Sequence, residues 1–253
     1  MPSNINHKTL STLIAILVAI FTTGYLRIHW IPFLPESDGG FYTFFSQYFY
    51  TTLANGEIIT PSYPVALYSL LTSWVYGLDI NQYMALRWID LCLAVIASTL
   101  FFKVIEKESG SLFFSVVTVS AVLIVMNNYS FILYGFRNSM WAAYVPLFLA
   151  LYLSQTINNK NHYLFYFIGA VAAFGVLLRE PFLFFYITGA IAILFAYGWK
   201  ILVKYLIGSA ILGFITLFIL LLLRGTGDLQ IIIESYIGLF GGMQDLDDEL
   251  LIS

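Results

Sequence analysis

Several stretches of fifteen or more consecutive residues in this chain contain no charged side chain. In the hydrocarbon core of a membrane no water pairs with backbone groups, so a segment of this kind must form a helix or part of a closed barrel. The stretches lack the alternation of a barrel and exceed its strand length of roughly 9–11 residues. Only 10% of the residues are charged, against about one quarter in a soluble domain. The sequence therefore predicts an all-α polytopic membrane protein.

Seven hydrophobic segments support a count of about seven transmembrane helices. The first is too long for a typical signal-peptide core and no small-residue cleavage site follows it, so we interpret it as an uncleaved span with a cytoplasmic N-terminus. Residues 163–199 are broken only by Arg179-Glu180-Pro181. As one helix they would measure about 55 Å, against a core of about 30 Å, so we expect two spans there. The segments are 9–26, 80–105, 111–131, 139–156, 163–178, 181–199 and 201–223.

Two shorter amphipathic segments lie in the first outer loop, residues 29–79. Residues 41–53 and 61–78 each separate apolar from polar side chains at helical spacing, which is typical of a helix lying in the membrane interface. We expect Asn55-Gly56 to join them. The predicted apolar faces are Phe41, Phe44, Phe45, Tyr48, Phe49 and Leu53 in the first, and Tyr63, Leu67, Leu70, Leu71, Trp74 and Leu78 in the second.

The sorting of basic residues indicates a topology. If residues 61–78 do not cross the membrane, all six lysines face the cytoplasm and all five arginines face the opposite side. If they do cross, five basic residues lie inside and six outside, so the count of positive charges barely separates the two arrangements. We favour the first, because gathering the arginines on one face suits a functional surface. Residues 1–223 then form the transmembrane domain, and 224–253 form a Gly-rich, acidic tail.

Some classes of partner and cofactor have no support in the sequence. The net charge of −3 provides no basic patch to neutralise phosphates, so we expect no nucleic-acid partner. His7, His29 and His162 are scattered, and Cys92 is the single cysteine, so no zinc motif is present. We expect no metal and no cofactor; a divalent ion at Asp38 is supported by no motif.

An ordered set of residues follows the first span. It consists of Asp38, the aromatic segment 41–53, Asn55-Gly56, Pro61 and Pro64, Gly77, and Arg87. In this order the chain resembles the C-type (GT-C) membrane glycosyltransferases, which include protein O-mannosyltransferases and lipid A aminoarabinose transferases. The resemblance covers about residues 10–105, and Leu178-Arg179-Glu180-Pro181 is similar to an arginine-containing break of that family. The chain departs from the family in having fewer spans, no C-terminal soluble domain and a displaced second proline.

The resemblance implies an inverting glycosyltransferase of the cytoplasmic (inner) membrane. Such enzymes transfer a sugar from a polyprenyl-phosphate-linked donor to a glycan, lipid or protein acceptor on the outer, periplasmic or extracellular, side. Asp38 would deprotonate or orient the acceptor hydroxyl, with Glu57 as a second carboxylate. The alternative role for Asp38 is to cap the helix that follows it, and for Glu57 it is to lie solvated at the surface.

Three arginines are the candidates for binding the phosphate of the donor. Arg87, Arg137 and Arg179 lie at outer ends of predicted spans, where cations would offset the charge of the leaving group. The alternative is that they pair with neighbouring carboxylates or extend to the interface. Tyr42 and Tyr63 would position the substrate.

Other functions remain open from the sequence. A transporter or flippase for lipid-linked oligosaccharides would have ionisable residues in mid-span and internal repeats, and few of the former and no convincing repeat are found. A polysaccharide polymerase usually has its large loop between later spans, whereas the largest loop here is the first. A shortened, inactive scaffold is the third alternative.

Overall fold

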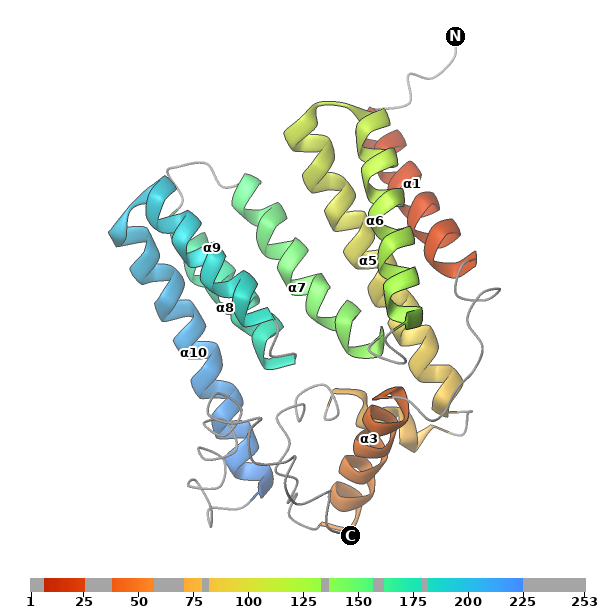
Figure 1. Cartoon of the computed structure of the whole chain (residues 1–253). Coiled ribbons are helices and arrows are strands. Elements are labelled where there is room, and N and C mark those ends of the chain that lie inside the picture. The colour runs from red at the N-terminus through yellow and green to blue at the C-terminus, as the bar shows by residue number, and fades with distance from the viewer. Residues whose placement is uncertain are drawn as a thin grey trace, which may run out of the picture.

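The computed structural model describes residues 7–25, 38–56, 71–78, 82–132, 137–156, 162–178 and 182–224. All regular structure in these ranges is helical, so the predicted all-α class is confirmed. Figure 1 shows long helices side by side, with α3 below one end of the bundle. The elements are α1 (His7–Ala19), its π-helical continuation η1 (Ile20–Tyr25), α3 (Asp38–Ala54), the 3-10 helix η2 (Trp74–Gly77), α5 (Gln82–Ser109), α6 (Leu112–Ile132), α7 (Arg137–Thr156), α8 (Leu164–Leu178), α9 (Phe182–Tyr197) and α10 (Trp199–Arg224).

Glycines with positive φ end two of the long helices. The predicted span 80–105 ends too early, because α5 continues through residues 106–109 to Ser109. Lys103 and Glu106 form an ion pair of 3.1 Å on the last turns, and Gly110, with φ of 65°, ends the helix. Gly198, with φ of 81°, separates α9 from α10 in the same way. A left-handed residue at this position is the usual end of an α-helix, and glycine adopts it without steric cost.

Contacts between helices establish which helix ends lie together at each end of the bundle. The ammonium of Lys103 donates a hydrogen bond to Ser11 Oγ, so the start of α1 lies beside the end of α5. The ring of Phe101 stacks on that of Phe148 at 4.7 Å, and α5 and α7 run parallel (Figure 1). The ring of Phe165 contacts that of Tyr197 at 5.0 Å, so α8 and α9 are antiparallel.

Basic residues of the described helices are sorted between the two ends of the bundle. The arginine end is where α5 and α7 begin and α10 ends, and it carries the backbones of Arg87, Arg137 and Arg224. The lysine end is where α1 and α10 begin and α5 ends, and its lysines are Lys8, Lys103, Lys107, Lys200 and Lys204. This is the sorting predicted for a chain in which residues 61–78 do not cross between the two ends. Residues 61–70, Arg27, Lys160 and Arg179 lie outside the described residues.

Helices α8 and α10 approach each other closely through two glycines. A Cβ on Gly169 would overlap the carbonyl oxygen of Tyr205, and one on Gly208 would overlap that of Tyr166. Ser209 Oγ donates a hydrogen bond of 3.0 Å to the carbonyl oxygen of Gly169 at the same crossing. Small residues that let backbones approach, with a hydroxyl bonding across, are typical of helix pairs packed in lipid.

One helix of the described part of the chain is both long and apolar enough to cross a membrane, Trp199–Thr216 within α10. Four shorter apolar helices accompany it, at His7–Thr22, Leu112–Val125, Leu164–Leu178 and Phe182–Tyr197. The last two have 15 and 16 residues, which is about 22–24 Å at 1.5 Å per residue. That length falls short of a hydrocarbon core of about 30 Å. The count of about seven transmembrane helices therefore stays a prediction.

The α8–α10 crossing gives a stability prediction. We expect Gly208→Ala to lower the thermal stability of the purified protein, because the new methyl group overlaps a backbone oxygen that cannot move without separating the helices. Overpacking of this kind costs about 1–3 kcal/mol.

The control for this variant lies on the same helix. Nothing lies within 4 Å of a Cβ built on Gly213, so Gly213→Ala should gain helix propensity and raise stability by up to about 1 kcal/mol. Equal melting temperatures for the two variants would contradict the close approach of α8 and α10.

Candidate functional site

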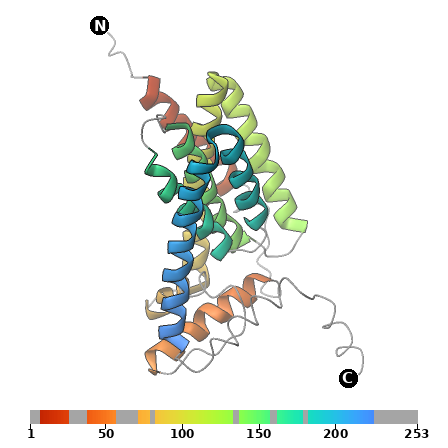
Figure 2. The ribbon, with the colours of Figure 1, turned by 90° about the vertical axis from the view of Figure 1, so that its left-hand side faces the viewer.

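Helix α3 lies at the arginine end and begins at Asp38. The sequence placed the start of this helix at residue 41, but the helix includes Gly39 and Gly40 in its first turn. Gly39 and Gly40 are therefore part of the helix and not of a loop before it. Asp38 is the first helical residue, a position where a carboxylate is favoured by the helix dipole. Figure 2 shows α3 lying obliquely to the long helices, with α10 reaching down to its level.

The segment 71–78 packs against α3 through a buried pair of hydroxyls. Ser46 Oγ and Thr72 Oγ1 are 2.7 Å apart, and both side chains are buried. Gly77 is close to the ring of Tyr50, since a Cβ there would lie 3.2 Å from Tyr50 Cε2. The glycine named in the family resemblance therefore has a packing reason in this chain. Of the predicted helix 61–78, only 71–78 is described, as a helical turn followed by η2.

This segment is also anchored to α5. Val75 and Tyr76 are buried in a cluster with Tyr50, Ala85 and Ile89. Burial raises the pKa of Tyr76 to about 12. Segment 71–78 is thus held to both α3 and α5 at the arginine end.

Segment 71–78 buries both polar and apolar side chains. Thr72, Ser73, Val75 and Tyr76 are buried, whereas Leu71, Trp74 and Leu78 are exposed. The described members of the apolar face predicted from the sequence are therefore exposed, and the contacts with α3 and α5 come from the other residues.

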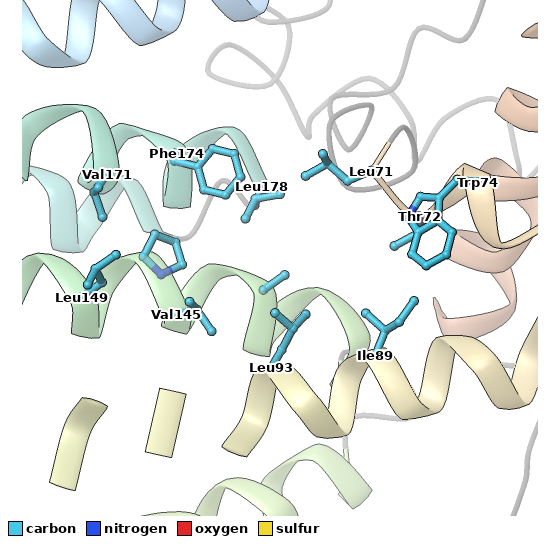
Figure 3. Close-up of a pocket in the computed structure, with 12 residues that line it drawn as sticks. Leu71, Thr72, Trp74, Ile89, Leu93, Val145, Leu149, Val171, Phe174 and Leu178 are labelled. Carbon is cyan, nitrogen blue, oxygen red and sulfur yellow. The ribbon is translucent and has the colours of Figure 1, made fainter. Parts of the chain in front are cut away.

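A pocket of about 370 Å³ opens between α5, α7 and α8 (Figure 3). Segment 71–74 lines the side of the pocket that faces the arginine end of the bundle. Its lining is apolar apart from Thr72, whose hydroxyl already bonds to Ser46. The lining residues are Leu71, Thr72, Trp74, Ile89, Leu93, Ala142, Val145, Pro146, Leu149, Val171, Phe174 and Leu178. Its volume lies in the range of small-molecule pockets, and its lining suits a hydrocarbon chain.

Two of the predicted phosphate-binding residues have backbones near the pocket. Arg87 precedes the lining residue Ile89 by two positions on α5, and Arg137 is the first residue of α7, five positions before the lining residue Ala142. Arg179 directly follows Leu178 in the sequence, a lining residue and the last of α8, but itself lies outside the described residues.

The remaining predicted residues are placed only in part. Tyr42 lies in the second turn of α3, at the same end of the bundle as Asp38. Glu57 and Tyr63 lie outside the described residues, as does the tail from residue 225 onward. For Asp38, Tyr42, Arg87 and Arg137 the description covers the backbone and not the side chain. The structure thus brings four of the seven candidates to the arginine end by backbone position.

Sequence reasoning missed the pocket. Pro146 lies inside α7, where it lacks the N–H that an interior helical residue donates, and it lines the pocket. Gly175 of α8 packs there, since its Cβ would lie 3.7 Å from Pro146 Cγ. A proline and a glycine within apolar segments were the available signal. The other lining residues could not be told from lipid-facing ones, because α7 and α8 are apolar on most sides.

Metal ligands do not gather in the described part of the chain, where no three His, Cys, Asp or Glu side chains come together. Comparison of the chain with protein-family models, with characterised proteins and with solved structures gives no match. The functional inference therefore depends on the residues, the pocket and the ends of the bundle described above.

Proposed function

We propose that this chain is a polytopic membrane glycosyltransferase that transfers a sugar from a polyprenyl-phosphate-linked donor to an acceptor on the outer side of the membrane. The observation that carries the proposal is the apolar pocket inside the arginine end, beside the backbones of Arg87 and Arg137. A polyprenyl-phosphate donor has the same two parts, a hydrocarbon chain joined to an anion.

The membrane part of the proposal is supported by the outer surface of the bundle. Phe113 of α6, Phe195 of α9 and Phe214 of α10 are 79%, 85% and 72% exposed. Exposed apolar area costs about 25 cal/mol per Å² in water, and large contiguous apolar patches are rare on soluble monomers. A lipid environment removes this cost on all three helices.

The thickness of a membrane does not prevent the shorter helices from crossing it. A span shorter than the hydrocarbon core is accommodated by local thinning of the bilayer, at fractions of a kcal/mol per Å. Helices α8 and α9 would cross in this way as a pair, with the Arg179-Glu180-Pro181 break at the outer side.

The two kinds of candidate side chain have distinct parts in the proposed reaction. The acceptor hydroxyl oxygen attacks the anomeric carbon of the sugar, and the bond from that carbon to the phosphate oxygen breaks in the same displacement. Asp38 takes the hydroxyl proton, and Arg87, Arg137 and Arg179 offset the negative charge on the departing polyprenyl phosphate. One displacement inverts the anomeric configuration, and no metal is needed for this balance of charge.

The role of the Asp38 carboxylate is tested by a substitution that removes its charge and keeps its size. We expect Asp38→Asn to reduce transfer by about 10²–10⁴-fold, the usual contribution of a general base. Surface glycans profiled in a host that requires the gene provide the measurement. Glu108→Gln at the lysine end, where Glu108 accepts a hydrogen bond from Gln155, is the matched control and should leave the profile intact. Unchanged glycans with Asp38→Asn would overturn the role of Asp38.

The pocket is tested by filling it. Val171 lines the pocket, so Val171→Phe should raise KM for a long-chain polyprenyl donor by about tenfold or more. A donor with a very short prenyl chain should react as before, which separates loss of the pocket from loss of the fold. The same enlargement at Val125, 64% exposed on α6, should change neither KM. If Val171→Phe affected both donors equally, the lipid-chain role of the pocket would be lost.

A further inference from the structure

Lys200 and Lys204 form a basic pair at the lysine end that no carboxylate of the described chain neutralises. Lys200 is exposed and Lys204 is half-buried on the first turns of α10. Helices α8, α9 and α10 contain no acidic residue. Neither lysine has an ion pair within the described residues, so the pair leaves two positive charges on this side of the bundle.

Lysines on the opposite side of the same end are already satisfied within the protein. Lys103 pairs with Glu106 and also donates to Ser11, and Lys107 donates to the carbonyl oxygen of Gln155. The lysine end therefore has one half, on α1 and α5, where Glu106 and Glu108 lie among the lysines, and another half, on α8–α10, that carries lysines and no carboxylate.

Aromatic rings surround the charged half. The ammonium of Lys204 lies 5.1 Å from the ring centre of Tyr163 and 6.0 Å from that of Tyr166. Tyr163 is 77% exposed and Trp199, next to Lys200, is 65% exposed. Exposed tyrosine and tryptophan at a helix end are typical of residues at the level of lipid headgroups.

We propose that Lys200, Lys204, Tyr163 and Trp199 form a binding site for the headgroup phosphate of an anionic phospholipid in the cytoplasmic leaflet. An ammonium has three donors, so the contact of Lys204 with the tyrosine faces leaves N–H groups for phosphate oxygens. The rings fix the depth of the helix end at the headgroups, and the exposed apolar side of α10 continues from there along the acyl chains. The site rests on the proposed membrane location but not on glycosyl transfer, and it lies at the end opposite to the candidate active site.

Native mass spectrometry of the purified full-length protein with an equal mixture of phosphatidylglycerol and phosphatidylcholine tests the site. We expect phosphatidylglycerol to be retained in preference, and the preference to fall about fivefold per lysine in Lys200→Gln and Lys204→Gln. Lys107→Gln, which removes a lysine already bonded within the protein, should keep the preference. The double Lys→Arg variant at 200 and 204 should keep it too, since the charge is preserved.

Other outcomes overturn the proposal. Equal retention of the two lipids, or a preference unchanged in the double Lys→Gln variant, would remove the site. Displacement of the lipid by millimolar inorganic phosphate would show a site for the free anion instead of the lipid. None of these readouts uses sugar transfer, so failure here and failure of the proposed enzyme activity are distinguishable.

Discussion

The arrangement of the bundle depends on keeping charged side chains away from the middle of its helices. Helices α6, α8 and α9 contain no charged residue, and α7 has only Arg137, its first residue. In the longer α5, charges lie near both ends and residues 91–102 carry none. A charge at mid-helix would be costly in lipid, whereas one at an end reaches water or a headgroup. With the proposed membrane location, every ionisable candidate for the proposed chemistry lies at one end of the bundle or the other.

The two ends are built differently from this common constraint. At the lysine end, side chains of α1, α5 and α7 bond to one another: Lys103 contacts Ser11, and Gln155 donates to the carbonyl oxygen of Val104. At the arginine end, α3 and segment 71–78 lie across the bundle beside an apolar pocket. A closed, internally bonded end suits anchoring, and an end with a pocket and arginines suits binding of an amphipathic donor. The proposed roles of the two ends, donor binding at the arginine end and anchoring at the lysine end, follow from that contrast.

Much of the fold could be predicted from the sequence, and the exceptions have physical reasons. Long uncharged runs predict helices directly, and α6, for example, lies at 112–132 where 111–131 was expected. The start of α3 was placed too late because Gly39-Gly40 has the composition of a loop, while its neighbours continue the helix. The α8–α10 crossing at Gly169 and Gly208 and the pocket at Pro146 depend on which side of an almost wholly apolar helix faces a neighbour. Periodicity cannot reveal that side when every side is apolar. Of the candidate site, the sequence located the end of the bundle but not the pocket.

The most direct test of this account is the side of the membrane on which each end of the bundle lies. Asn55 at the arginine end and Ser109 at the lysine end are both exposed, and each can be replaced by cysteine in a Cys92→Ala background. A membrane-impermeant maleimide added to sealed right-side-out vesicles should label N55C and leave S109C unlabelled until the membrane is permeabilised. Labelling of both positions before permeabilisation, or of S109C alone, would contradict the proposed topology and with it the placement of the candidate site on the outer face.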